Sequence, residues 1–291
     1  MASAATVERG EARTAKARKR PARAPRRWYL GLLAWLIGLL FFAPVAWMVL
    51  TALHSEGDAA ANPPALAAAL TLDGFRNFFE QNPWPSMINS AAASIVSTLV
   101  VLLLAVPAAY ALSIKPVEKW TDVMFFFLST KFLPPVAGLL PIYLIATQLG
   151  ALDNLITLVV IYTSMNLPIA VWMLRSFLVE VPREILEAAE LDGARLPTLL
   201  RRIVLPVIAP GIAATSLICF IFSWNELLFA RSLTSTAAST APVFLTGFIT
   251  SQGLFLAQLC AASFLVSLPV LIAGFAAQDK LVQGLSLGAV K

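Results

Sequence analysis

Six long, mainly apolar runs constrain this chain more than any other feature of its sequence. A helix needs about 20 consecutive apolar residues to cross a bilayer, and each run is close to that length. The runs cover residues 29–53, 88–113, 123–147, 155–174, 207–229 and 254–277. Charged residues make up only 13% of the chain, against about 25% in soluble domains, so the polar surface of a large water-soluble domain is missing. The sequence therefore predicts an all-α integral membrane protein with six transmembrane helices.

The positions of lysine and arginine predict which side of the membrane each segment faces. Nine of the 21 Lys and Arg residues lie in the first 27 positions, whereas segments 55–85 and 231–253 contain one each. Because positive residues collect on the cytoplasmic side, both termini are predicted to be cytoplasmic. Residues 1–27 are expected to form a disordered basic tail held by anionic membrane lipid, which accounts for the net charge of +5 without nucleic acid. Residues 28–291 are expected to form one six-span domain.

The sequence offers no group of residues suited to catalysis or metal binding. Its one histidine, His54, ends the first run, and no Ser-His-Asp or Cys-His set can be assembled around it. Cys219 and Cys260 lie in apolar runs, where we expect small core residues rather than a disulfide or a metal pair. A G-x-x-x-x-G-K-[ST] phosphate loop is missing from the sequence. No catalytic residue, metal or cofactor is therefore predicted for this chain, and any ATP would be hydrolysed by another chain.

One polar stretch interrupts the apolar part of the chain, at residues 178–206 between the fourth and fifth runs. Pro182 suits the first turn of a helix, and Gly193 suits the left-handed position that follows a helix. Pro197 falls in the first turn of a second helix, predicted over residues 194–202. The stretch is therefore predicted to form two short helices outside the bilayer, on the cytoplasmic side.

Three motifs in this stretch resemble the EAA loop of ABC importer permeases. They are Glu187-Ala188-Ala189, Asp192-Gly193-Ala194 and Ile203-x-Leu205-Pro206. An E-A-A triplet alone would fit an ordinary solvated loop, because Glu and Ala are good helix formers, but the full pattern between two spans favours the family. The resemblance implies a coupling helix that docks on a separate ATPase and passes its closure to the membrane helices. It assigns this coupling to Glu184, Glu187, Ala188, Ala189, Asp192, Gly193, Ala194 and Arg195.

Weaker motifs extend the resemblance over nearly the whole chain and point to the second permease subunit of heterodimers in the carbohydrate-uptake group. They are Asn89-Ser90, residues 129–135, Asn166-Leu167-Pro168, residues 223–226 and residues 281–291. The resemblance implies a multi-pass protein in the plasma membrane of a prokaryote that carries a sugar or sugar alcohol. It also implies the partners: a second permease subunit, two ATPase subunits that bind ATP and Mg²⁺ at the cytoplasmic face, and an extracytoplasmic solute-binding protein.

Polar and aromatic residues inside the predicted spans are candidates for the solute path: Lys131, Tyr143, Asn166, Trp224, Asn225 and Glu226. A charge inside a membrane costs at least about 2.5–3.5 kcal/mol, so Lys131 is expected to face a cavity or a partner. A structural ion pair or a snorkelling lysine fits Lys131 equally well. The alternative for Asn166, slightly favoured, is hydrogen bonding between helices; for Trp224 it is an interface anchor, and for Tyr143 core packing. The neighbouring Pro134-Pro135 pair is predicted to kink the third span.

Three other function classes are alternatives to a carbohydrate permease. An ABC importer permease for a non-carbohydrate solute would contain the same loop, because the loop does not report solute identity. An ion-coupled secondary transporter would need buried acids in several spans, and Glu226 is the one strong candidate in the sequence. A membrane enzyme would need a nucleophile, metal ligands or an acid–base pair at one membrane face, and the sequence contains none of these.

Overall fold

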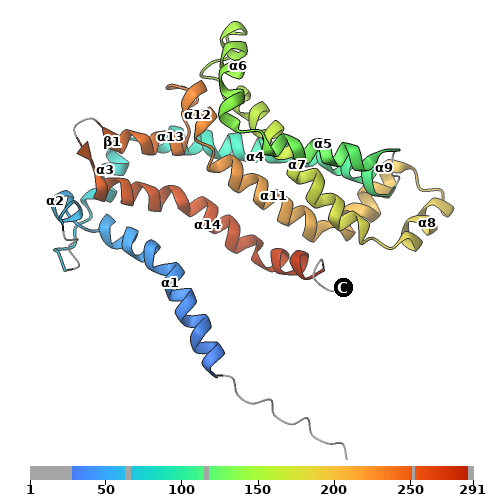
Figure 1. The fold of residues 1–291 in the computed structure, drawn as a ribbon, viewed down its shortest axis with the longest axis horizontal. Helices are drawn as coiled ribbons and strands as arrows, with labels where there is room; N and C mark the ends of the chain where they lie inside the picture. Colours follow the sequence, from blue (N-terminus) through green and yellow to red (C-terminus); the bar gives the residue numbers. More distant parts are fainter. Residues whose placement is uncertain (1–27, 63–66, 115–117, 251–252, 288–291) are drawn as a thin grey trace, which may run out of the picture. The chain divides into compact units, whose positions relative to one another are not determined.

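The computed structural model describes residues 28–62, 67–114, 118–250 and 253–287. Apart from one pair of two-residue strands, β1 (Ile249–Thr250) and β2 (Gly253–Leu254), its regular structure is helical, which confirms the all-α prediction (Figure 1). The predicted basic tail, residues 1–27, and the last four residues of the C-terminal motif lie outside the described residues.

Four helices are long and apolar enough to cross a membrane: α1 (Trp28–Ala52), α4 (Trp84–Ser113), α7 (Leu155–Val179) and residues 256–278 of α14 (Leu256–Leu287). The number rises to six if each of two bent helix pairs is one span. The first pair is α5 (Trp120–Phe132) with α6 (Pro135–Gln148), bent by 88°, and the second is Leu196–Val207 with α11 (Ala209–Trp224), bent by 80°. The first, second, fourth and sixth runs thus correspond to single long helices and the third to the pair of α5 and α6. The fifth corresponds to α11, and the helix that precedes α11 in the second pair belongs to the polar stretch.

The third run is broken rather than kinked, which corrects the prediction for Pro134-Pro135. A proline disfavours helical conformation in the residue before it, and here two prolines follow one another. Leu133 and Pro134 accordingly have extended backbones, with ψ of 124° and 125°, and α6 starts afresh with Pro135 in its first turn. The fifth run also ends earlier than predicted, because α11 stops at Trp224 and Asn225 caps it.

Residues 28–46 of α1 form a unit of their own, separate from residues 47–291. Tryptophan, leucine and phenylalanine occur on all sides of this part of the helix, and every residue from 28 to 47 is exposed. A helix that is apolar all round must be covered by lipid or by protein, so this unit is suited to a membrane environment.

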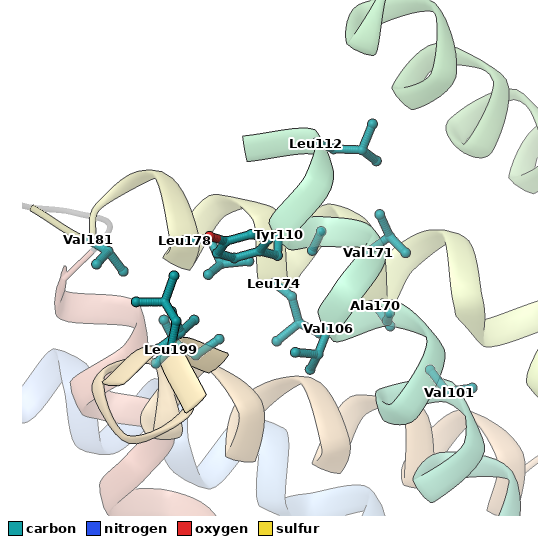
Figure 2. Packing of buried hydrophobic residues seen from close by; sticks show 14 of the residues in the cluster. Val101, Val106, Tyr110, Leu112, Ala170, Val171, Leu174, Leu178, Val181 and Leu199 are labelled. Carbon is teal, nitrogen blue, oxygen red and sulfur yellow. The ribbon is translucent and has the colours of Figure 1, made fainter. Parts of the chain in front are cut away.

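The centre of the larger unit is the contact between α4 and α7, which run side by side and are joined by α11 (Figure 1). Ala105, Ala109 and Ala170 have no exposed surface, and small residues of this kind let membrane helices approach closely. Figure 2 shows the larger side chains of this core, among them Val106 from α4 and Leu174 from α7. The rest of the bundle is arranged around this contact.

The segment between α11 and α14, predicted as an outer segment rich in Ser and Thr, is a folded cap. It contains α12 (Leu228–Leu233), α13 (Ala241–Leu245) and the 3-10 turn Thr246–Phe248. The Asn89-Ser90 pair near the start of α4 attaches this cap to the bundle. The Asn89 amide donates to the carbonyls of residues 237 and 239 at 2.9 and 3.0 Å. The Ser90 hydroxyl accepts from the backbone N–H of Ala241 at 2.8 Å. Two further short helices, α2 (Glu56–Ala59) and α3 (Asp73–Glu80), lie between α1 and α4 in the chain.

Candidate functional site

Four of the six predicted solute-path residues line one cavity of about 280 Å³. It lies where the end of α5, the middle of α7 and the end of α11 meet. The residues around it are Lys131, Tyr162, Met165, Asn166, Phe222, Ser223, Asn225 and Glu226. The cavity therefore combines one cation, one carboxylate, two amides and two hydroxyls with apolar walls, a composition typical of a site for a small polar molecule.

A second cavity of about 250 Å³ lies at the break between α5 and α6, and Lys131 and Met165 line both cavities. Pro134, Pro135 and Gly138 form part of its wall. Irregular backbone at membrane depth is tolerated where it lines a cavity, which fits the break in this third run. Lys131 makes no ion pair with a carboxylate of the described residues.

Asn166 contacts both a neighbouring helix and the cavity. Only 3% of its surface is exposed. Its amide nitrogen donates to the backbone carbonyl of Tyr162 at 2.9 Å and to the Ser223 hydroxyl on α11 at 3.0 Å. The hydrogen bonding between helices that the sequence favoured for Asn166 is therefore present, and it does not exclude the residue from the cavity lining.

Glu226 is fixed by the cap segment that follows α11. Its Oε1 accepts from the backbone N–H of Phe229 at 2.9 Å, and its Oε2 accepts from that of Ala230 at 3.0 Å. A carboxylate at a helix start is stabilised by the free N–H groups there, in this case those of α12. Each oxygen retains further acceptor capacity.

The structure places Trp224 and Tyr143 away from this cavity. Trp224 is 3% exposed, its indole N–H donates to the carbonyl of Val266 on α14 at 3.2 Å, and its ring lies near Phe220. An indole has an N–H that needs a partner when buried, and α14 supplies it. Tyr143 is 39% exposed on α6, which the break turns away from α5, and it lines neither cavity.

The predicted coupling segment contains two helices, and the second, predicted over residues 194–202, runs from Leu196 to Val207 with a π-helical turn inside it. The first helix is α8 (Arg183–Leu191), and the second consists of α9 (Leu196–Leu199), the π-helical turn (Leu200–Val204) and α10 (Leu205–Val207). Gly193 has φ of +78°, the left-handed conformation predicted for it. The N–H of Ala194 donates to the carbonyl of Ala189 and the N–H of Gly193 to that of Glu190, both at 3.0 Å, which closes the end of α8.

One face of α8 packs on the bundle and the other is exposed. Leu186 and Ala189 are buried in the same apolar cluster as Leu178 and Leu199. Ala189 therefore serves this contact within the chain, whereas Glu184, Glu187, Ala188, Asp192, Gly193 and Arg195 are exposed and Ala194 is half-buried. Leu191 is 88% exposed beside them. The exposed face thus mixes charged residues with an uncovered leucine.

A pocket of about 240 Å³ lies between the end of α4 and α8. Ser113, Arg183, Glu187 and Glu190 contribute its polar groups. Among the residues that the structure describes, no three His, Cys, Asp or Glu side chains are grouped so that they could hold a metal ion.

The family model for binding-protein-dependent transport system inner membrane components matches residues 86–286, which contain the cavity and the coupling segment. The chain belongs to this family of ABC transporter permeases. It is 38% identical over 267 residues to a probable ABC transporter permease of Sinorhizobium fredii, covering 91% of this chain and 96% of the relative. It is also 33% identical to the diacetylchitobiose uptake permease of Streptomyces coelicolor (88% and 93% covered) and 30% identical to the trehalose transport permease of Mycobacterium tuberculosis (92% and 99% covered). Two of these relatives are named for sugars, and the family is one of inner membrane components.

The fold of this permease is that of a solved bacterial ABC transporter involved in import of the acidic polysaccharide alginate. The TM-score is 0.71 at 19% identity, covering 90% of this chain and all of that one. A second structure shows that alginate transporter in complex with a periplasmic protein bound to an alginate pentasaccharide, with a TM-score of 0.63 at 17% identity (86% and 92% covered). At these identities the likeness concerns the fold alone.

Sequence reasoning missed two groups of residues that organise the permease. Ser97, fully buried on α4, contacts Ser223 at 3.1 Å behind the cavity. The serines at positions 90, 94 and 97 follow helical spacing on one face of α4, and this pattern was the available signal. Asp153, in the turn before α7, accepts hydrogen bonds from the loop of residues 235–238, and nothing in the local sequence indicated that contact.

Proposed function

We propose that this permease pairs with a second permease subunit to form the channel of an importer for a neutral sugar or sugar alcohol. The observation that carries the proposal is the convergence of Lys131, Asn166, Asn225 and Glu226 on one cavity in a chain whose relatives include permeases named for sugars. A polyhydroxyl solute needs donors and acceptors at short range and no bond-making chemistry. Hydrogen-bonding side chains in a protected cavity meet that need.

The energy for transport comes from other chains in this proposal. Two ATPase subunits bind ATP and Mg²⁺ at the cytoplasmic face, and an extracytoplasmic binding protein delivers the solute. The exposed face of α8, with Glu184, Glu187, Ala188 and Leu191, docks on one ATPase. Its buried face, through Leu186, passes the movement to α7. Both termini and α8 are cytoplasmic in this arrangement, and the cap that contains α12 and α13 faces outside.

The two broken helices are suited to such a movement. α5 and α6 meet at 88° beside the cavity, and the coupling segment meets α11 at 80°. Discontinuous helices concentrate a change of angle at a few backbone positions while the helices themselves stay rigid. In the proposal, a shift of α8 therefore changes the angle at Ile208 and alters the opening around the end of α11.

Reconstitution of the whole transporter tests this proposal. Proteoliposomes with both permeases, the ATPases and the binding protein are assayed for uptake of labelled trehalose, melibiose, diacetylchitobiose and mannitol, with glycine betaine as a non-carbohydrate solute. We expect ATP-dependent uptake of at least one carbohydrate, and a loss of about tenfold or more for Lys131→Met and Glu226→Gln. Tyr143→Phe is the matched control, because its hydroxyl lies outside the cavity, and should keep uptake.

Three results would contradict the proposal. One is solute transport by the purified chain without an ATPase, which fits a secondary transporter. Another is uptake of glycine betaine but of none of the carbohydrates, which moves the permease to a different solute class. The third is unchanged uptake in both cavity variants, which removes the cavity from the solute path.

A further inference from the structure

Three side chains from three helices form a buried line of hydrogen bonds behind the cavity. The Asn166 amide of α7 donates to Ser223 of α11 at 3.0 Å, and Ser223 contacts the Ser97 hydroxyl of α4 at 3.1 Å. Ser97 in turn contacts the backbone carbonyl of Ser94 at 3.2 Å. All three side chains are nine-tenths or more buried. Ser97 does not line the cavity, so it acts on the cavity only through the other two.

The chemistry of the partners fixes the direction of every hydrogen bond in this line. The backbone carbonyl of Ser94 can only accept, so Ser97 uses its one hydrogen there. The contact between Ser97 and Ser223 is then a hydrogen bond only if Ser223 donates to Ser97. Ser223 has therefore used its hydrogen and can only accept from Asn166. One arrangement satisfies all the contacts, with each proton donated towards α4.

The same reasoning orients the Asn166 amide. The Tyr162 carbonyl, 2.9 Å away, can only accept, so the group that faces it must be the amide nitrogen and not the amide oxygen. Both N–H bonds of Asn166 are thus used, one by Tyr162 and one by Ser223. Within the described residues Oδ1 accepts no hydrogen bond. Asn166 can therefore offer the cavity an acceptor and no donor.

We propose that Ser97 is a positioning residue: it takes the hydrogen of Ser223, so that Ser223 must accept the second N–H of Asn166 and this N–H is kept from the cavity. The cavity then meets a solute only with the Asn166 oxygen, and it selects solutes with a donor, such as a sugar hydroxyl, at this position. The proposal rests on the solute path proposed above. A free hydroxyl can donate to Oδ1, whereas a fluorine or a methyl ether at the same carbon cannot. Site groups that hydrogen-bond a solute hydroxyl discriminate strongly against analogues that lack it, because the buried group is then left unpaired.

The first experiment tests the hydrogen-bond line without any solute. Ser97→Ala, Ser223→Ala and the double variant are compared in the full transporter by thermal unfolding in detergent. We expect each single variant to lower the Tm by about 2–4 °C and the double variant to fall by clearly less than the sum, because both remove parts of one network. Ser94→Ala is the matched control: its hydroxyl is equally buried on the same helix but has no partner, so its loss should leave the Tm unchanged or raised.

The second experiment tests recognition in proteoliposomes with saturating binding protein. The carbohydrate with the highest uptake among trehalose, melibiose, diacetylchitobiose and mannitol is compared with its monodeoxy and monodeoxyfluoro derivatives. At one hydroxyl position we expect the wild type to lose uptake about 2- to 12-fold for both derivatives alike, because fluorine keeps an acceptor but no donor. Asn166→Leu and Ser97→Ala should lose this selectivity, Ser97→Thr should restore it, and Ser94→Ala should keep it.

Each outcome decides the proposal. Additive Tm shifts for Ser97→Ala and Ser223→Ala would overturn the hydrogen-bond line. Full uptake of every fluoro derivative with loss only of deoxy derivatives would show that Asn166 donates, and wild-type selectivity in Ser97→Ala would remove the role of Ser97. If no carbohydrate is carried, the proposed function and the recognition role both fail, and the Tm series alone then reports whether the line exists.

Discussion

The guanidinium of Arg175 lies over the ring of Trp120, 3.9 Å from its centre. Arg175 is near the end of α7 and Trp120 begins α5, and the Arg175 Nε also donates to the carbonyl of Leu112 on α4 at 3.1 Å. One side chain thus joins three helices close to the coupling segment. Because α5 also contributes Lys131 to the cavity, this contact lies between the two parts of the site.

Replacing Arg175 should destabilise the bundle. A cation–π contact contributes about 0.5–2 kcal/mol and a charged hydrogen bond about 1.5–3 kcal/mol, so Arg175→Ala should lower the free energy of unfolding by about 2–5 kcal/mol. Arg175→Lys keeps the charge but lacks the planar group, and we expect an intermediate loss. Thermal unfolding in detergent measures both, with the exposed Arg201→Ala as control. Equal Tm values for Arg175→Ala and Arg201→Ala would contradict this role.

Gly193 and Gly150 offer a matched pair for testing the coupling segment. Both have positive φ, +78° and +61°, and an added Cβ at either would meet no atom within 4 Å. A side chain in this conformation costs about 1–2 kcal/mol, so Gly193→Val and Gly150→Val should lose similar stability and still insert into the membrane. Only Gly193→Val is expected to abolish solute-stimulated ATP hydrolysis in the reconstituted transporter. The same loss of ATPase activity in Gly150→Val would indicate a general effect of strain instead.

Gly211 on α11 is required by the ring of Phe177 on α7. A Cβ at Gly211 would lie 2.4 Å from that ring, which is too close for any real contact. Gly211→Ala should therefore cost about 1–3 kcal/mol, and Phe177→Ala should suppress most of that cost in the double variant. Gly274→Ala on α14 meets nothing within 4 Å and should be neutral or stabilising by up to about 1 kcal/mol. Additive losses for Gly211→Ala and Phe177→Ala in unfolding measurements would rule out the steric explanation.

Asp153 predicts a pH dependence of stability. Partial desolvation raises the pKa of the Asp153 carboxyl. Hydrogen bonds from the backbone amides of the 235–238 loop and from the Ser235 hydroxyl have the larger effect, and they hold this pKa well below its usual range. A pKa that is lower in the folded state contributes stability above the unfolded value of about 3.9, and that contribution is lost as pH falls through the folded pKa. The stability that Asp153 contributes through its hydrogen bonds to the 235–238 loop should therefore be constant from pH 8 to about pH 5 and decrease below about pH 4.

Asp153→Asn is the variant that tests the hydrogen bonds between Asp153 and the 235–238 loop. It retains one acceptor oxygen, and water can reach the site, so we expect a loss of about 1 kcal/mol at neutral pH. The difference in Tm between wild type and variant should shrink in acid. A difference that grows as the pH falls would show that the sign is wrong.

The local chemistry of the coupling segment was predictable from the sequence. Gly193 has the left-handed backbone that its position after α8 indicated, and Pro197 lies in the first turn of α9 as expected. These features depend on the conformational limits of single residues, which act over a few positions of the chain. The membrane-length helices were also predictable, because the length of an apolar run that can cross a bilayer follows from the bilayer's thickness.

The cavity was only partly predictable. Four of its lining residues could be identified as polar groups within apolar runs, and this identification needs no knowledge of how the helices pack. They are Lys131, Asn166, Asn225 and Glu226. Trp224, adjacent to Asn225 in the chain, faces α14 instead, because one residue along a helix turns the side chain by about 100° and α14 offers a carbonyl there.

The sequence by itself determined that this chain is a set of membrane-length helices interrupted by one polar stretch of two helices, because apolar length and backbone limits are local properties. Only the tertiary structure decided that the double proline is an 88° break, that Asp153 closes the 235–238 loop, and that Ser97 lies behind Asn166. The contacts of Asp153 and Ser97 join positions up to 126 residues apart, and they depend on how helices pack, which no local pattern encodes.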